Sequence, residues 1–199
     1  MIGLLVVKQS QIPVLIIASS NSNLIYNSSM VADKNNPLLK QLEEQRFEHA
    51  LSYADDSSHN LKKLTSQELV HINQLLTKQE SVLRLSNAEI QLKNGKIQSF
   101  SMISNPLIRA RDVIADARDI AFTGDLGEAV FHLYTQLILD HLFNDANRRT
   151  AAVAAYWLMG EKHIKIDVYT LLEIPVGDLR DLKTLKELRQ DIEVLVKQA

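Results

Sequence analysis

The 199-residue chain contains no cysteine, which excludes several classes of site before any motif is considered. Without thiols it has no disulfide, no thiol nucleophile and no thiolate metal site, and this fits a cytoplasmic protein. It also lacks an excess of positive charge: the formal net charge is −2, so the composition gives no indication of a nucleic-acid partner. Long hydrophobic runs are missing as well. The two apolar stretches near the N-terminus, residues 2–7 and 12–18, are each too short to span a membrane, so we expect no membrane partner.

The composition that remains is that of an ordinary globular protein, with 46% hydrophobic and 23% charged residues. Its length allows one domain with an extension. We expect an N-terminal extension over residues 1–60 and a second region over residues 61–199. The Val- and Ile-rich runs of the extension favour a β-hairpin or a pair of edge strands. A signal peptide is the minority alternative, because Lys8 follows the first apolar run and does not precede it.

Further along the extension, the Asn- and Ser-rich residues 21–36 predict a loop. A helix over residues 37–53 is expected to begin at a proline, and the polar residues 54–60 are expected to break it at the boundary. After the boundary, Thr65 and Glu68 have the spacing of a capping box at the start of another helix.

Helical periodicity dominates the rest of the chain, with one β signal. Asn94-Gly95 between alternating apolar residues predicts a β-hairpin with a type I′ turn. Residues 163–167 are a candidate short extended segment. The fold class expected is therefore mainly α with small β elements. The other expected helices cover residues 106–122, 126–140, 150–159 and 178–197.

The most informative stretch is residues 141–149, which read His-Leu-Phe-Asn-Asp-Ala-Asn-Arg-Arg and stand just before the almost wholly apolar helix 150–159. A helix that is apolar on every face is normally buried. Its first turn has amide groups without intrahelical partners, and the helix dipole adds partial positive charge there. Polar groups gathered at this end therefore indicate an anion site, most naturally for a phosphate.

The side chains of this stretch fit that interpretation. Ala146 lets the backbone approach a ligand closely, and Asn147 tolerates the backbone angles of a tight turn. Arg148 and Arg149 offer forked donors to phosphate oxygens.

Two further residues supply chemistry. Asp145 is a hard oxygen ligand beside the phosphates, which suggests Mg²⁺. His141 has an ordinary pKa near neutrality and is the natural general base.

With these residues in view, the chain resembles the Fic/Doc family, whose motif reads roughly HxFx(D/E)(G/A)N(G/K)R. The resemblance implies that His141 deprotonates a Ser, Thr or Tyr hydroxyl of a target protein, with ATP or another nucleotide as co-substrate. It implies that Asp145 holds Mg²⁺ and that Phe143 anchors the loop. The matching positions are His141, Phe143, Asp145, Ala146, Asn147 and Arg149. The nucleotide-binding residues expected on this basis are Asn144, Ala146, Asn147, Arg148 and Arg149.

The resemblance also gives the predicted hairpin a role. In Fic proteins a hairpin before the catalytic core aligns the target segment by accepting it as an added strand. The residues expected to form this flap are Ile90, Leu92, Asn94, Gly95 and Ile97.

Two departures leave the reaction open. Members that transfer AMP usually have Gly after the motif Asn and a second Arg three residues beyond the first, whereas this chain has Arg148 and Ala152. The motif is closer to the Doc branch, whose members transfer the terminal phosphoryl group. The same departures are compatible with a degenerate Fic scaffold that binds a partner without catalysis. No inhibitory (S/T)xxxE(G/N) motif is present, so inhibition would come from an antitoxin-like protein, from homo-oligomerisation, or from helix 37–53.

Overall fold

The computed structural model describes residues 37–91 and 95–199. Residues 35–199 form one compact unit, and the account below refers to its described part. The hairpin, loop and minority signal peptide expected before residue 37 lie outside the described residues. Of the extension expected over residues 1–60, the structure describes residues 37–60, and the expected division at residue 60 stays a prediction.

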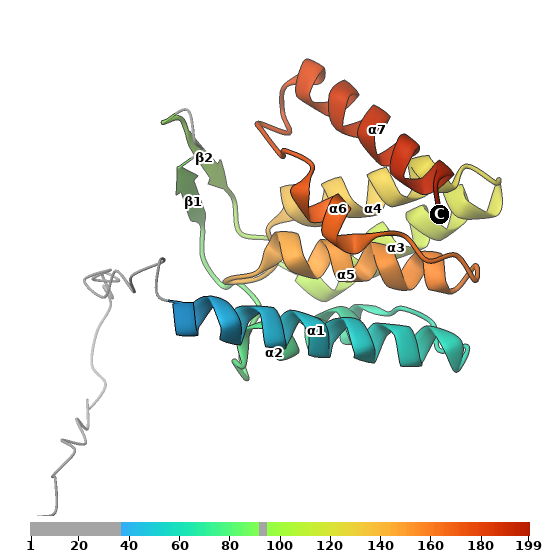
Figure 1. Ribbon diagram of the computed structural model, residues 1–199. Helices are drawn as coiled ribbons and strands as arrows, with labels where there is room; N and C mark the ends of the chain where they lie inside the picture. Colours follow the sequence, from blue (N-terminus) through green and yellow to red (C-terminus); the bar gives the residue numbers. More distant parts are fainter. Residues whose placement is uncertain (1–36, 92–94) are drawn as a thin grey trace, which may run out of the picture. The chain divides into compact units, whose positions relative to one another are not determined.

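Seven helices and one two-stranded antiparallel sheet make up the described part, which confirms the mainly helical fold class (Figure 1). In chain order the elements are α1 Pro37–His59, α2 Ser66–Thr77, β1 Ala88–Gln91, β2 Ile97–Phe100, α3 Pro106–Phe122, α4 Leu126–Asp140, α5 Asn147–Gly160, α6 Val168–Glu173 and α7 Leu182–Lys197. None of the helices in these ranges is both long and apolar enough to cross a membrane.

Helix α5 is the centre of the unit and packs against α1, α2, α4 and α6 (Figure 1). Its residues from Ala151 to Ala155, and from Trp157 to Met159, have no exposed surface. The sequence predicted this burial, because the helix is apolar on every face. It begins three residues earlier than expected, at Asn147, so the last residues of the polar stretch 141–149 form its first turn.

Helix α1 corrects one expectation. The polar residues 54–60 do not break it, because the helix continues to His59. Ala50, Ala54 and Ser58 are buried along its length. Near its end α1 lies so close to α5 that a Cβ on Gly160 would stand 2.5 Å from Ser58 Oγ. Small residues on this face let the two helices approach, and the burial that results outweighs the low helix propensity of Asp and Ser.

Side-chain caps set several helix starts. The Thr65 hydroxyl accepts the Glu68 N–H at 3.2 Å, as expected, but the Glu68 carboxylate turns to Tyr53 and Lys62, so only half of the capping box forms. Asp181 accepts the Thr184 N–H, and α7 therefore begins four residues later than expected. The segment 163–167 forms no strand, and α6, which follows it, was not predicted.

The predicted hairpin is present as β1 and β2, with Gln91 paired to Ile97 and Ala88 to Phe100. Five residues separate the strands. A two-residue turn centred on Asn94 and Gly95 would shift this register by one residue. The turn type itself falls on residues 92–94, outside the described residues.

Candidate active site

His141 lies at the C-terminal end of α4, directly after its last residue. It is the C-cap residue and has left-handed backbone angles, φ 47° and ψ 53°. A non-glycine residue in this region is strained and needs support from its surroundings. The Phe100 ring of β2 stacks on the imidazole, with ring centroids 4.5 Å apart and planes 25° from parallel. The imidazole is thereby held between a helix end and the hairpin.

The surroundings of His141 favour its neutral form. Burial lowers the pKa of His141, and the positive charge of Arg84 lowers it further, while the Asp145 carboxylate acts in the opposite direction. A neutral imidazole near pH 7 has a free lone pair and can accept a proton.

The loop after His141 is fixed from both sides. Phe143 is buried, as predicted for an anchor. Its N–H donates to Asn147 Oδ1 at 2.9 Å, and Asn147 Nδ2 donates to the Phe143 carbonyl at 2.8 Å. The preceding segment pairs with the loop as well: the Arg84 N–H donates to the Leu142 carbonyl at 2.9 Å. Asn147, expected to bind phosphate, uses its amide here to hold the loop.

The loop ends at an uncapped helix start. Ala146 is the N-cap of α5 with φ 57°, and it supplies no side-chain hydrogen bond to the first turn. That turn therefore keeps amide donors for an anion. Below it, the buried Asn73 of α2 donates to the Asp145 carbonyl at 2.9 Å and to Thr150 Oγ1 at 2.8 Å.

Asp145 is exposed beside this helix start, and its Oδ1 accepts the Ala146 N–H at 2.5 Å. No group of three or more acidic or histidine side chains in residues 37–91 and 95–199 is arranged to hold a metal. A single carboxylate next to a candidate phosphate site still fits Mg²⁺, which proteins commonly bind through one or two carboxylates together with substrate phosphates.

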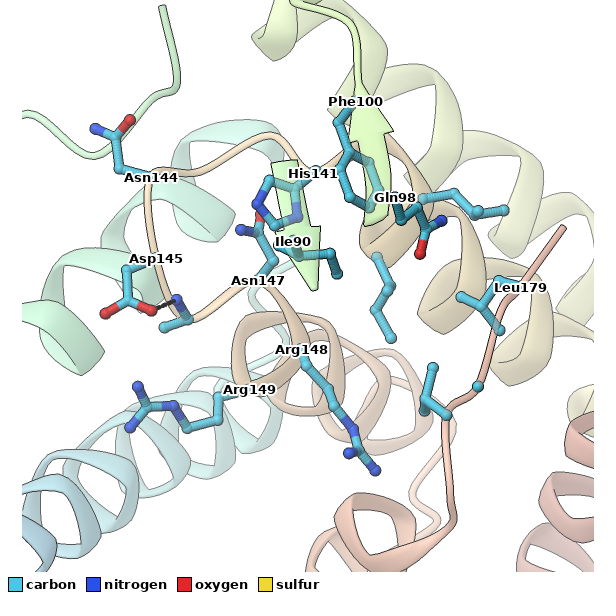
Figure 2. A pocket seen from close by; sticks show the side chains of 15 residues that line it. Ile90, Gln98, Phe100, His141, Asn144, Asp145, Asn147, Arg148, Arg149 and Leu179 are labelled. Carbon is cyan, nitrogen blue, oxygen red and sulfur yellow. Dashed lines mark hydrogen bonds between the residues drawn. The ribbon is translucent and has the colours of Figure 1, made fainter. Parts of the chain in front are cut away.

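The two arginines take different places. Arg148 points away from His141 (Figure 2) and donates to the Tyr134 hydroxyl and to the carbonyls of Leu172 and Ile174. Arg149 forms an ion pair with Glu43 of α1 at 3.5 Å. The Glu43 side chain is 59% exposed, so this pair adds little stability and a phosphate could displace it.

A cavity of about 420 Å³ joins these groups (Figure 2). Its volume is in the range of small-molecule sites. All five expected nucleotide-binding residues line it, together with His141 and Asp145. Of the expected flap residues, Ile90 lines it, Ile97 is exposed and Gly95 has φ +82°. Leu92 and Asn94 lie outside the described residues.

Sequence reasoning missed three residues at this site. Phe100 stacks on His141, Arg84 bonds to the backbone of the same residue, and Asn73 holds the loop. Only Asn73 had a signal: it is a polar residue at a helical spacing otherwise occupied by the apolar Leu69, Ile72 and Leu76.

No protein-family model and no curated protein sequence matches the chain. Solved structures do. A Fic domain containing signaling protein from Bacteroides thetaiotaomicron is 12% identical, with a TM-score of 0.59, covering 79% of this chain and 68% of its own. IbpAFic2 covalently tethered to Cdc42 is 17% identical, with a TM-score of 0.53, and the match covers 81% of this chain and 55% of that one. Fic-1 from C. elegans is 18% identical, with a TM-score of 0.55, and the match covers 87% of this chain and 55% of that one.

The chain therefore has the Fic fold, and the resemblance drawn from the motif is confirmed at that level. The likeness to the Doc branch stays a prediction.

Proposed function

We propose that the chain is a transferase that moves a phosphoryl or AMP group from Mg²⁺·ATP to a hydroxyl side chain of a target protein, with His141 as general base. One observation carries this proposal: a histidine held toward its neutral form, an exposed carboxylate and an uncapped helix start share one cavity. The neighbour tethered to Cdc42 supports a protein as the target class.

The chemistry follows from the arrangement. The phosphates would lie at the first turn of α5, near Arg149, and Mg²⁺ held by Asp145 would neutralise their charge. His141 takes the proton of the target hydroxyl while its oxygen attacks phosphorus. Attack on the terminal phosphorus releases ADP, and attack on the α-phosphorus releases pyrophosphate. Positioning and charge neutralisation supply most of the catalysis in such transfers.

Intact-mass spectrometry of candidate targets, and of the chain itself, after incubation with Mg²⁺·ATP tests the proposal. A gain of one phosphate or one AMP identifies the group transferred.

Replacing His141 with Ala should lower the transfer rate by roughly 10² to 10⁴, the contribution of a well-placed base. ATP affinity measured by calorimetry should change little, because the imidazole does not hold the phosphates. The matched control is His49→Ala, an exposed histidine of α1 outside the cavity, which should keep full activity. Full activity in His141→Ala would show that the base is assigned wrongly.

A catalytically degenerate scaffold that binds a partner is the second candidate, and two contacts favour it. The Arg148 guanidinium donates to the Tyr134 hydroxyl and to carbonyls in and just after α6. The Asn147 amide donates to the Phe143 carbonyl. Absence of any mass gain in every target, together with absence of ATP binding, would favour this reading. An antitoxin-like inhibitor and a homo-oligomer stay predictions.

A further inference from the structure

Arg84 lies between the hairpin and the end of α4, and only 5% of its surface is exposed. Its hydrogen-bond acceptors among the described residues are all backbone carbonyls. Nε donates to His141 at 2.6 Å; Nη1 donates to Ser86, and to Phe100 at 3.2 Å; Nη2 donates to Ser101 at 2.8 Å and to Asp140 at 3.4 Å.

These acceptors belong to two separate parts of the fold. Asp140 and His141 are the end of α4, where the last carbonyls lack helical partners and the helix dipole favours a cation. The other three acceptors lie where the hairpin begins and ends: Ser86 comes before β1, Phe100 is the last residue of β2, and Ser101 follows it. One planar guanidinium therefore joins the backbone of the proposed base to the root of the hairpin.

Stability alone does not account for this arrangement. Burial lowers the pKa of Arg84, because removal from water disfavours the charged form. A buried charge is costly, and a well-packed neutral side chain is often the more stable choice. What arginine offers in return is a rigid fork of donors that can hold several acceptors at fixed spacing.

The hairpin also touches the base directly. The carbonyl of Phe100 accepts from Arg84, and the ring of the same residue stacks on His141. Ile90 and Gln98, on the two strands, line the cavity. A change in the position of the hairpin root would therefore move both the imidazole and one wall of the cavity.

We propose that Arg84 is a positioning residue that fixes the distance between the hairpin, which would present the target segment, and His141. The inference rests on the proposed function for its role. Its geometric part, the coupling of the hairpin to the base, holds even in a scaffold without catalysis.

The test compares Arg84→Lys with Arg118→Lys. Lysine keeps the charge, but its single ammonium cannot reach both sets of carbonyls. Arg118 is a matched control, because it also joins distant segments through the Leu64 carbonyl and Glu161, but at a place remote from the cavity. Hydrogen exchange of the amides in β1 and β2, with the amides of α5 as internal reference, reports the hairpin.

In Arg84→Lys the hairpin amides should exchange about tenfold faster or more, since bonds to a charged donor are lost, while α5 amides change little. The ring-current shift of the His141 imidazole protons from Phe100 should shrink in the NMR spectrum. Arg118→Lys should leave the exchange of the hairpin amides and the ring-current shift of His141 unchanged. Uniform acceleration over all elements, or unchanged hairpin exchange in Arg84→Lys, would overturn the inference and leave Arg84 a purely structural residue.

A measurement on the unsubstituted chain keeps the inference open to refutation if Arg84→Lys does not fold. The Arg84 Nε–H and the hairpin amides should be protected by the same factor, each relative to its own intrinsic exchange rate, if both are released in one opening of the hairpin from α4. A protected Nε–H beside freely exchanging hairpin amides would refute the coupling. Neither readout needs transfer activity, so failure of this inference is distinct from failure of the proposed function.

Discussion

The two ends of α5 treat charge in opposite ways. Just beyond the C-terminal end, Glu161 has a side chain only 4% exposed, yet its carboxylate is fully engaged. It accepts the Leu64 N–H at 2.7 Å and two bonds from Arg118 at 2.7 and 3.1 Å, and Lys63 lies 3.6 Å away. These contacts tie the α1–α2 connection and α3 to the central helix.

At the N-terminal end, Asp145 stands exposed with a single backbone donor, and no ion pair to it is found within the described ranges. The helix start beside it has no side-chain cap, and the ion-pair partner of Arg149 in the described part of the chain, Glu43, is exposed to solvent. The two ends of one helix therefore have different roles. Charges that satisfy each other hold the fold, whereas charges left half-satisfied are available to a ligand.

Removing the buried carboxylate should give the largest effect on stability. Glu161→Ala leaves Arg118 and the Leu64 N–H without their carboxylate acceptor, and we expect a loss of about 3 kcal/mol in the free energy of unfolding. Urea denaturation monitored by Trp157 fluorescence measures it. Glu187→Ala, which removes a carboxylate 62% exposed and paired with Lys183, is the control and should cost less than about 0.5 kcal/mol. Equal losses would remove the contrast between the two kinds of carboxylate.

The exposed carboxylate should behave in the reverse manner. Asp145→Asn is expected to change stability by less than about 0.5 kcal/mol, because it breaks no ion pair. ATP affinity in the presence of Mg²⁺ should fall by at least about tenfold, the lower end of the loss seen when even an outer partner of a metal is removed. Calorimetric titration with and without Mg²⁺ separates the effects. A loss of the same size without Mg²⁺ would argue against a role in holding the metal.

Lowering the pH should change stability at the two ends of α5 over different pH ranges, with smaller effects than these substitutions. A hydrogen bond from Tyr156 is the main cause that lowers the pKa of Asp55 near the C-terminal end, so its stabilisation is present above pH 3.8 and is lost as pH falls through the folded-state pKa. Burial lowers the pKa of His141, so below pH 6.5 the unfolded chain binds a proton that the folded one does not, and stability falls with pH down to the folded-state pKa.

For the same reason the acid limb of the transfer rate should have its midpoint below pH 6.5. NMR titration of the imidazole measures the pKa directly. A midpoint at or above pH 6.5 would mean that burial does not set the pKa of His141.

The sequence predicted the helical elements with strong local signals. Pro106 marked the start of α3, and the apolar pattern marked α4 and the buried face of α5. It failed where tertiary contacts decide. Residues 54–59 are helical because α1 packs closely on α5, and the short α6 ends where Arg148 binds the carbonyls of Leu172 and Ile174.

For the site, the motif located His141, Asp145 and the start of α5 in one cavity. Spacing could not show that the amide of Asn147 bonds to the loop backbone, nor that the Arg148 guanidinium points away from His141. Arg84 and Phe100 carried no signal, because their roles arise from backbone carbonyls and ring stacking between segments far apart in the chain.

The near-contact of Ser58 with Gly160 has a consequence for how such a chain could diversify. The Ser58 side chain packs against Gly160 with no room for a methyl group between them, so movement of one helix along or around the other is restricted at this point. This contact fixes the C-terminal end of α5, opposite the end that lines the cavity, against α1, so adaptation to partners of other shapes falls on the hairpin. Substitutions there could change what is recognised and leave the frame of the chemistry intact.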